Sequence, residues 1–424
     1  CFIINFTLLF LSCIESSSIH DPTLTHFDPL VFRQMFPALS HSGIYLDSAA
    51  TALKPQALLD ATLAYYGHHS GSVHRGHYAI ANESTAQYEQ ARHCVARFIN
   101  AKRSEEIIWT KGATESLNLV AQGYAANVLR AGDEIIVSEM EHHANLIPWL
   151  IVAKQTGAHV VKLPLGANYA PTSEHLKQVI SPRSKILAIS QMSNVTGAQP
   201  NLNELIALAH AHNITVVVDG AQGVVHQPTD VQALDADFYA FSAHKLYGPT
   251  GVGVLYGKTD KLAAIPYWQG GGKMLTHASF NAFTAAALPY RLEAGTPNIA
   301  GVLGFKAVLE WLSKIDNYQA QAYTEALCHE AYQALAAIPG FKGYKAAHST
   351  LFSFTISPYH PSDLITLLGE QNIALRSGQH CAEPMINALG VNGTLRVSFA
   401  PYNSRDDVEK LTHALHLAIS LLED

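Results

Sequence analysis

Residues 237–251 contain an apolar, aromatic segment that ends abruptly in small and polar residues before a Gly-Pro pair. Such a run predicts a buried β-strand, and the Gly-Pro pair predicts that the chain turns immediately after it. The strand leads into Ser242, His244 and Lys245. A lysine that is partly desolvated and lies near another potential cation has a lowered pKa, so its amine becomes nucleophilic enough to form a Schiff base. Taken alone, a lysine at this position is more often an ordinary surface lysine that follows a strand.

A second segment, residues 214–219, is a β-branched run that ends in Asp219. Near-continuous apolar strands are typical of a parallel sheet covered on both faces, and ligands of such sheets bind at the carboxyl ends of the strands. A carboxylate at that position can keep a pyridinium nitrogen protonated, which makes the ring an electron sink. Asp219 could instead cap a helix. Together, Asp219 and Lys245 at the ends of successive strands favour a site for pyridoxal 5'-phosphate (PLP).

Strands and helices alternate from about residue 107 to 255, and this pattern predicts a doubly wound α/β domain. The chain has 424 residues, more than one hydrophobic core usually spans, so we expect two domains. We place the large domain at residues 32–311 and a smaller α+β domain at 312–424. The C-terminal pattern predicts strands at 350–357 and 394–400 and helices at 301–314, 318–338, 362–370 and 405–422.

Composition and charge exclude some function classes. The net charge of −7 provides no polycationic surface, so we expect no nucleic-acid partner. The five cysteines are scattered and form no C-x-x-C, which indicates neither a disulfide framework nor a structural zinc site, and we expect a reducing, cytoplasmic location and no metal. Residues 1–13 are apolar but too short to span a bilayer, so we expect no membrane association and treat residues 1–31 as a disordered extension, with a targeting segment as the alternative.

Two motifs, VDGAQ at 218–222 and FSAHKLYGPTG at 241–251, resemble the PLP motifs of class V aminotransferase-fold cysteine desulfurases. The similarity is to the bacterial SufS/CsdA type and extends from about Phe32 to the C-terminus. It implies PLP-dependent transferase fold type I, with a large doubly wound, mainly parallel sheet domain and a smaller α+β C-terminal domain. It also implies a homodimer, with the loop that carries His74 and Arg75 near the dimer interface.

The resemblance implies a cofactor site built from several loops. The helix N-terminus after residues 107–110 is a phosphate cradle on physical grounds, because its free backbone N–H groups favour an anion, although in isolation the same residues would be an ordinary capping segment. Relatives usually carry a second threonine where this chain has Ala113, so one hydroxyl contact is absent from the expected cradle. By resemblance His142 stacks on the PLP ring and relays protons, and Thr296 reaches the phosphate of the neighbouring subunit. The implied cofactor-binding residues are Lys245, Asp219, Gln222, Ser242, His244, Thr114, Ala113, Asn194, His142 and Thr296.

Cys381 lies in a polar loop with His380 and Arg376 nearby. Neighbouring positive charge favours the thiolate, and the resemblance implies that Cys381 is the catalytic cysteine. Cys94 and Cys328 lie in predicted helices, where a cysteine is usually a small buried hydrophobe.

Substrate binding is implied chiefly for Arg396, whose forked guanidinium suits a carboxylate bidentately. Arg376, Asn194 and His74 complete the implied set. The alternative role for either arginine is an ion pair inside the small domain.

These assignments imply a cysteine desulfurase that is a sulfurtransferase. Lys245 removes the Cα proton of L-cysteine, Cys381 takes the sulfur as a persulfide, L-alanine leaves, and an acceptor protein of the SufE/CsdE type receives the sulfur for iron–sulfur cluster or other sulfur metabolism. Selenocysteine lyase and cysteine sulfinate desulfinase stay open, with L-selenocysteine or cysteine sulfinate as substrate, because they share every residue named except a strict need for Cys381. An ordinary aminotransferase and a non-catalytic sulfur-carrier scaffold are further alternatives.

Overall fold

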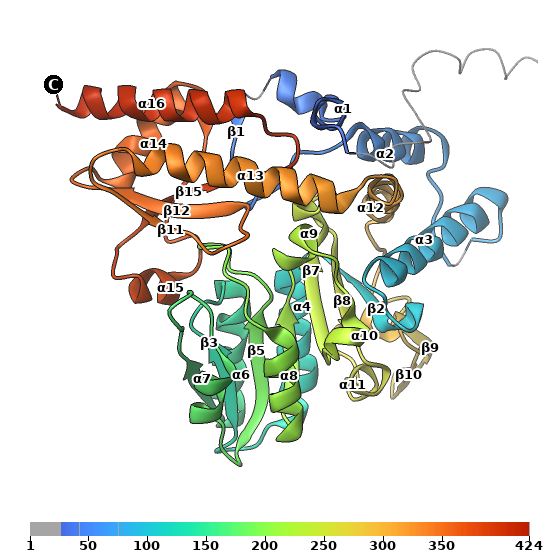
Figure 1. Cartoon of the computed structure of the whole chain (residues 1–424). Coiled ribbons are helices and arrows are strands. Elements are labelled where there is room, and N and C mark those ends of the chain that lie inside the picture. Colours follow the sequence, from blue (N-terminus) through green and yellow to red (C-terminus); the bar gives the residue numbers. More distant parts are fainter. Residues whose placement is uncertain (1–26, 42, 75, 424) are drawn as a thin grey trace, which may run out of the picture.

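A computed structural model describes residues 27–41, 43–74 and 76–423 (Figure 1). Most of the predicted N-terminal extension, residues 1–26, and Arg75 lie outside the described residues. Among the described residues, no helix has both the length and the apolar character needed to cross a bilayer.

A seven-stranded sheet forms the centre of the larger part of the molecule, in the order β2-β8-β7-β6-β5-β3-β4. Strands β7, β6, β5, β3 and β4 run parallel, and β8 is antiparallel to both β2 and β7. The predicted doubly wound, mainly parallel sheet is therefore confirmed. The strand bounds are β2 Ile107–Thr110, β3 Glu134–Ser138, β4 His159–Leu163, β5 Ser184–Ser190, β6 Thr215–Asp219, β7 Phe238–Ser242 and β8 Gly253–Gly257.

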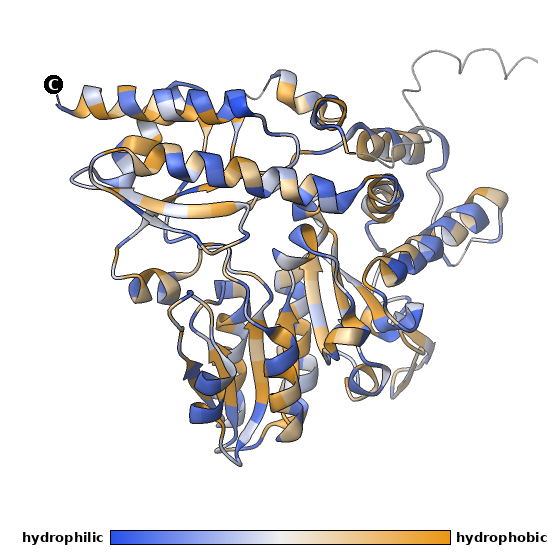
Figure 2. Cartoon of the chain, viewed as in Figure 1, coloured by the Kyte–Doolittle hydropathy of each residue, from blue (hydrophilic) through white to orange (hydrophobic). Residues whose placement is uncertain are grey.

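Both faces of this sheet are buried, as continuous apolar strands require. Successive side chains of a strand point to opposite faces, so Val216 and Val218 join one hydrophobic cluster and Val217 joins the other. Figure 2 shows these central strands as predominantly hydrophobic. Helices that contribute to the first cluster are α2 Gln56–His68, α3 Ala79–Phe98, α7 Ser173–Val179, α8 Leu202–Ala211 and α12 Ile299–Leu312; the second contains residues of α4 Ala113–Leu119 and α6 Ile147–Thr156.

A four-stranded antiparallel sheet, in the order β11-β12-β15-β14, forms the centre of the C-terminal part. Its strands are β11 Phe341–Tyr344, β12 Leu351–Ile356, β14 Arg376–Gly378 and β15 Thr394–Ser398, and the helices packed with it are α13 Asn317–Ala336, α14 Pro361–Glu370 and α16 Arg405–Glu423. This is the predicted smaller α+β unit. It shares its core with the N-terminal segment, because β1 Ile44–Tyr45 pairs with β13 Ile373–Ala374 and Leu46 is buried in the same cluster. The domain boundary at 311/312 stays a prediction.

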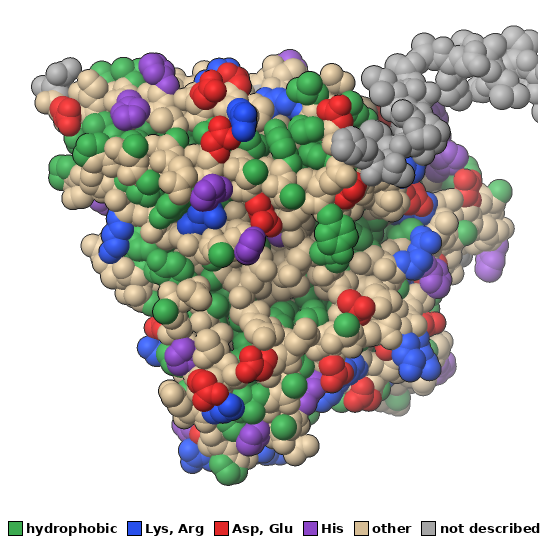
Figure 3. All heavy atoms as spheres, in the orientation of Figure 1, with side chains coloured by type: hydrophobic (Ala, Val, Ile, Leu, Met, Phe, Trp, Pro, Cys, Tyr) green, Lys and Arg blue, Asp and Glu red, His purple; other side chains and the backbone are tan. Residues whose placement is uncertain are grey.

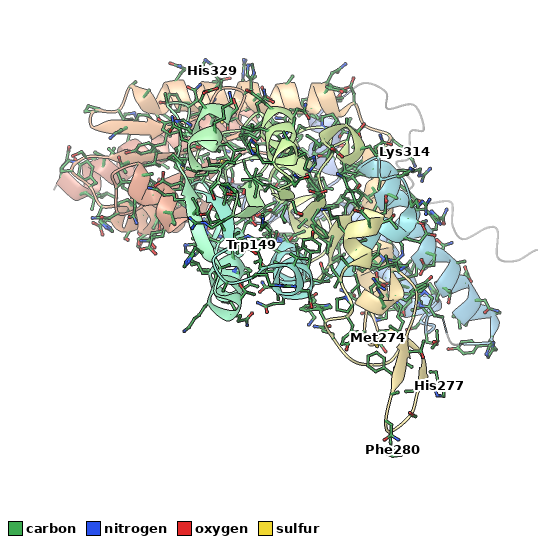
Figure 4. All side chains as sticks on the ribbon, turned by 90° about the horizontal axis from the view of Figure 1, so that it is seen from below. Trp149, Met274, His277, Phe280, Lys314 and His329 are labelled. Atoms are coloured by element: carbon green, nitrogen blue, oxygen red, sulfur yellow. The ribbon has the colours of Figure 1, made fainter. Side chains whose placement is uncertain are left out.

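The remaining elements are short. A hairpin of β9 Leu275–Ala278 and β10 Phe283–Ala285, which the sequence analysis did not predict, projects from the molecule with Phe280 at its tip (Figure 4). The other helices are α1 Pro29–Gln34, α5 Ala126–Val128, α9 Gly223–His226, α10 Val231–Leu234, α11 Thr259–Ala263 and α15 Glu383–Ala388. Figure 3 shows acidic and basic side chains interspersed over one face of the molecule.

Candidate functional site

A pocket of about 180 Å³ lies at the carboxyl ends of β5, β6 and β7, where an open α/β sheet binds its ligands. Three strand ends, Ser190, Asp219 and Ser242, contribute to its wall. The structure brings most of the predicted site residues together here. Those that line the pocket are Ala113, Thr114, His142, Asn194, Asp219, Gln222, Ser242, His244, Lys245, Arg376 and Arg396.

Lys245 ends the short 3₁₀ helix Ala243–Lys245 that follows β7, and Asp219 is the last residue of β6. Burial lowers the pKa of Lys245 to about 8, although Asp219 acts in the opposite direction. Burial likewise raises the pKa of Asp219, whose Oδ1 accepts a hydrogen bond of 2.9 Å from the backbone N–H of Ala221. The pocket therefore holds a lysine that loses its proton far more readily than an exposed lysine does, beside a buried carboxyl group.

The predicted phosphate cradle adjoins the end of β7. Gly112 caps α4, and the backbone N–H of Ala113 donates to Ser242 Oγ at 2.7 Å. A Cβ at Gly253 would lie 2.3 Å from the Cα of Gly112, so β8 passes directly under this turn and only glycine fits there. Thr114 and Ser242 supply the hydroxyl groups of the cradle, while Ala113 supplies only backbone.

His142 lines the pocket from the loop after β3. Its Nδ1 accepts a hydrogen bond of 3.0 Å from the backbone N–H of Ala144. Burial, with a further contribution from Lys245, lowers the pKa of His142 to about 3. The imidazole is therefore neutral near pH 7 with its proton on Nε2, which can act as a donor.

Arg396 is almost completely buried in the pocket wall, with only 2% of its surface exposed. Its Nη1 donates to the carbonyl of Asn194 at 2.9 Å, and its Nη2 donates to Asp47 at 3.0 Å. Arg396 thus forms an ion pair, but its partner is Asp47 of the N-terminal segment and not a residue of the small domain. The Arg396 side chain also lines the pocket. Arg376, on β14, is the register partner of Arg396 and is exposed. The sequence analysis did not identify Asp47; its place in the small-residue segment 44–55 was the available signal.

Cys381 lies on the loop between β14 and α15 and is exposed, whereas Cys94 and Cys328 are buried, as predicted. Burial raises the pKa of Cys328 to about 12. Cys381 and the residue before it, His380, both have φ of 54°, a region that side chains rarely adopt. The loop is held by contacts from across the pocket: the N–H of His143 donates to the Cys381 carbonyl at 2.6 Å, and Asn194 Nδ2 donates to the His380 carbonyl at 2.8 Å.

His74 and Thr296 do not reach this pocket within one chain. His74 Nε2 lies 2.7 Å from Glu89 Oε1, and Thr296 lines a separate cavity of about 490 Å³. Both are near one buried charge network, because Arg92 bonds Glu89 as well as Glu293, three residues before Thr296. Their implied roles stay predictions that depend on a neighbouring subunit.

A buried glutamate beside His142, Glu141, also escaped the sequence analysis. It is 1% exposed, and burial raises its pKa to about 7 against the effect of its hydrogen bonds to serine and asparagine. Its position directly before His142 was the only signal. Among the described residues, no group of three or more His, Cys, Asp or Glu side chains could hold a metal ion.

Comparison with known proteins shows the family of this chain. The aminotransferase class-V family model matches residues 44–411. The chain is 55% identical to the cysteine desulfurase CsdA of Escherichia coli, over 94% of this chain and 99% of the relative, and 49% identical to a probable cysteine desulfurase of Vibrio cholerae, over 92% and 98%.

The similar solved structures are also cysteine desulfurases. The crystal structure of E. coli CsdA in an S-sulfonic acid form superposes with a TM-score of 0.90 at 55% identity, covering 93% of this chain and 99% of that one. The apo cysteine desulfurase of Thermococcus onnurineus superposes with a TM-score of 0.88 at 33% identity, over 93% and 99%. The protein therefore belongs to the class-V aminotransferase family and, within it, to the PLP-dependent cysteine desulfurases.

Proposed function

We propose that this protein releases L-alanine from L-cysteine and holds the sulfur as a persulfide on Cys381. The observation that carries the proposal is that Lys245, Asp219 and Arg396 line one pocket. The loop that carries Cys381 is hydrogen-bonded to the pocket-lining Asn194 and to His143, which follows the pocket-lining His142. An ordinary aminotransferase needs the first three residues but has no use for an exposed thiol at this position.

The residues present fit PLP. The buried carboxyl of Asp219 suits a protonated ring nitrogen, Lys245 offers an amine with a lowered pKa, and the cradle of Thr114 and Ser242 offers donors to a phosphate. Gln222 Oε1 is buried, lacks a partner among the described residues, and belongs to a side chain that lines the pocket. When bound, PLP supplies an electron sink for bond changes at the substrate Cα.

The chain's own residues divide the remaining tasks. Arg396 holds the substrate carboxylate, and the neutral Nζ of Lys245 takes the proton from the substrate Cα. The Cys381 thiolate attacks the substrate sulfur: an S–S bond forms, and the C–S bond breaks with its electron pair on carbon, which takes up a proton on the way to L-alanine. A neutral His142 places an Nε2–H donor at the same wall of the pocket.

The exposure of Cys381 suits transfer of its sulfur to an acceptor protein. Because Cys381 is exposed, a protein of the SufE/CsdE type can reach its persulfide without opening the fold. Neither His74 nor Thr296 reaches the pocket of its own chain. In a homodimer, these two residues of one subunit would contact the pocket of the other subunit.

The test is alanine release from L-cysteine, with mass spectrometry of the protein after the reaction. We expect alanine, and one added sulfur atom on Cys381. Cys381→Ala should abolish both with L-cysteine while sparing L-selenocysteine, and Cys94→Ala serves as the matched control. Alanine release that persists unchanged in Cys381→Ala would refute the persulfide route.

A further inference from the structure

Glu141 directly precedes the pocket-lining His142 but does not itself line the pocket. Its carboxylate accepts four hydrogen bonds. Its Oε1 accepts from Ser138 Oγ at 2.6 Å and from the backbone N–H of Ser190 at 2.8 Å. Its Oε2 accepts from Asn145 Nδ2 at 2.6 Å and from Ser190 Oγ. Each oxygen thus receives two donors, the full complement that a carboxylate accepts when it is ionised, as Glu141 is above its pKa of about 7.

These donors come from three places in the fold. Ser138 ends β3, Asn145 lies at the far end of the loop that carries His142, and Ser190 ends β5. Asn145 is itself anchored, because its Oδ1 accepts from the indole N–H of Trp149 at 2.9 Å, and Trp149 is fully buried in α6 (Figure 4). Glu141 therefore closes the loop at both ends and fastens it to the neighbouring strand.

Within this closed loop His142 has a defined orientation. Its Nδ1 is occupied by the N–H of Ala144, so its Nε2 is the nitrogen available to a ligand. Ser190, which Glu141 binds twice, is the pocket-lining residue opposite Asp219 in the sheet register.

We infer that Glu141 is a positioning residue for His142: its buried carboxylate locks the loop 138–145 to the end of β5, so that the Nε2–H of His142 faces the pocket. This inference rests on the proposed function only for its kinetic readout. Glu141 does not touch the substrate; it acts through the loop.

The test is Glu141→Gln. An amide has one acceptor oxygen, so its NH₂ group must face an obligate donor, either the Asn145 amide or the Ser190 N–H, and the loop loses its fastening on that side. A displacement of about 1 Å at a reacting group costs on the order of 10²-fold in rate, so we expect kcat to fall about that much. KM should change little, because Arg396 is untouched. Glu139→Gln, which removes an outward carboxylate bonded to Lys162, is the matched control and should leave kcat unchanged.

A second readout uses the cofactor-free chain. In histidine ¹⁵N spectra, with His142 assigned by its absence in His142→Asn, the native loop should show an unprotonated Nδ1 and a protonated Nε2, and Glu141→Gln should show a mixture of both tautomers. Should Glu141→Gln fold poorly, Ser138→Ala removes one donor of the four and should shift kcat and the spectrum less, in the same direction.

The inference is overturned if Glu141→Gln keeps kcat within about twofold of the wild type, or if kcat falls while the His142 spectrum stays native. If the wild-type chain releases no alanine, the proposed function fails, and the spectra of the cofactor-free chain still decide the role of Glu141.

Discussion

Replacing Arg396 with lysine should remove the preference for a substrate with a free carboxylate. Arg396 is almost fully buried, and its fork is already oriented by the Asn194 carbonyl and by Asp47. Lysine keeps the positive charge opposite Asp47 but offers one point donor in place of a planar fork. The variant therefore tests the fork geometry and not merely the charge.

The magnitude follows from the lost hydrogen bond. A hydrogen bond to a charged group contributes roughly 1.5–3 kcal/mol, and each 1.36 kcal/mol is tenfold in rate. We therefore expect kcat/KM for L-cysteine to fall by roughly 10- to 150-fold. L-cysteine methyl ester, which has no carboxylate, should lose far less.

The assay is sulfide release in the presence of a reductant, measured with both substrates under the same conditions. Arg405→Lys, which alters an exposed arginine paired with Glu330, is the matched control and should change neither value. An equal loss on L-cysteine and its methyl ester would show that Arg396 serves only as an ion pair with Asp47, and would refute the assignment to substrate binding.

Three further predictions concern titration, reactivity and stability. Iodoacetamide should alkylate Cys381 in the folded chain well before Cys328, whose pKa burial raises to about 12; peptide mass spectrometry showing equal labelling would contradict this. Burial lowers the pKa of Lys245 from 10.5 to about 8, so between those values the unfolded cofactor-free chain binds more protons than the folded one. Its free energy of unfolding should therefore rise with pH over that window, by roughly 3 kcal/mol at most from Lys245, and denaturant titrations at the two ends of the window should show a smaller rise in Lys245→Met, because Lys54, whose pKa burial also lowers to about 8, still contributes. Glu293→Ala removes the buried partner of Arg92 and leaves that buried arginine with Glu89 alone, so it should cost about 3 kcal/mol, against under about 1 kcal/mol for the exposed Glu330→Ala; equal shifts in thermal unfolding would count against that reasoning.

Much of the fold could be predicted because its signals are local. The strand that leads to Lys245 and the strand that ends in Asp219 are contiguous apolar runs with a sharp stop, and the structure has them at 238–242 and 215–219. Helices α14 and α16 likewise follow the predicted ranges closely. The short pairings were not predictable in the same way: β13 and β14 have two and three residues, too few for any periodicity to show.

The site residues likewise fall into those with a local sequence signal and those without one. Residues that stand at the end of a strong strand were identified from their neighbours in the chain. Asp47 and Glu141 were not, because their roles depend on partners brought by folding: Asp47 meets Arg396 across 349 positions, and Glu141 meets Ser190 across 49.

By itself the sequence determined the fold class and the family, and it predicted which residues carry the chemistry, because a reactive side chain and the strand or loop that presents it are adjacent along the chain. Only the tertiary structure decided how those groups are oriented and charged. Burial lowers the pKa of Lys245, and the sheet register places Arg376 opposite Arg396. The packing of distant segments leaves His74 outside the pocket of its own chain.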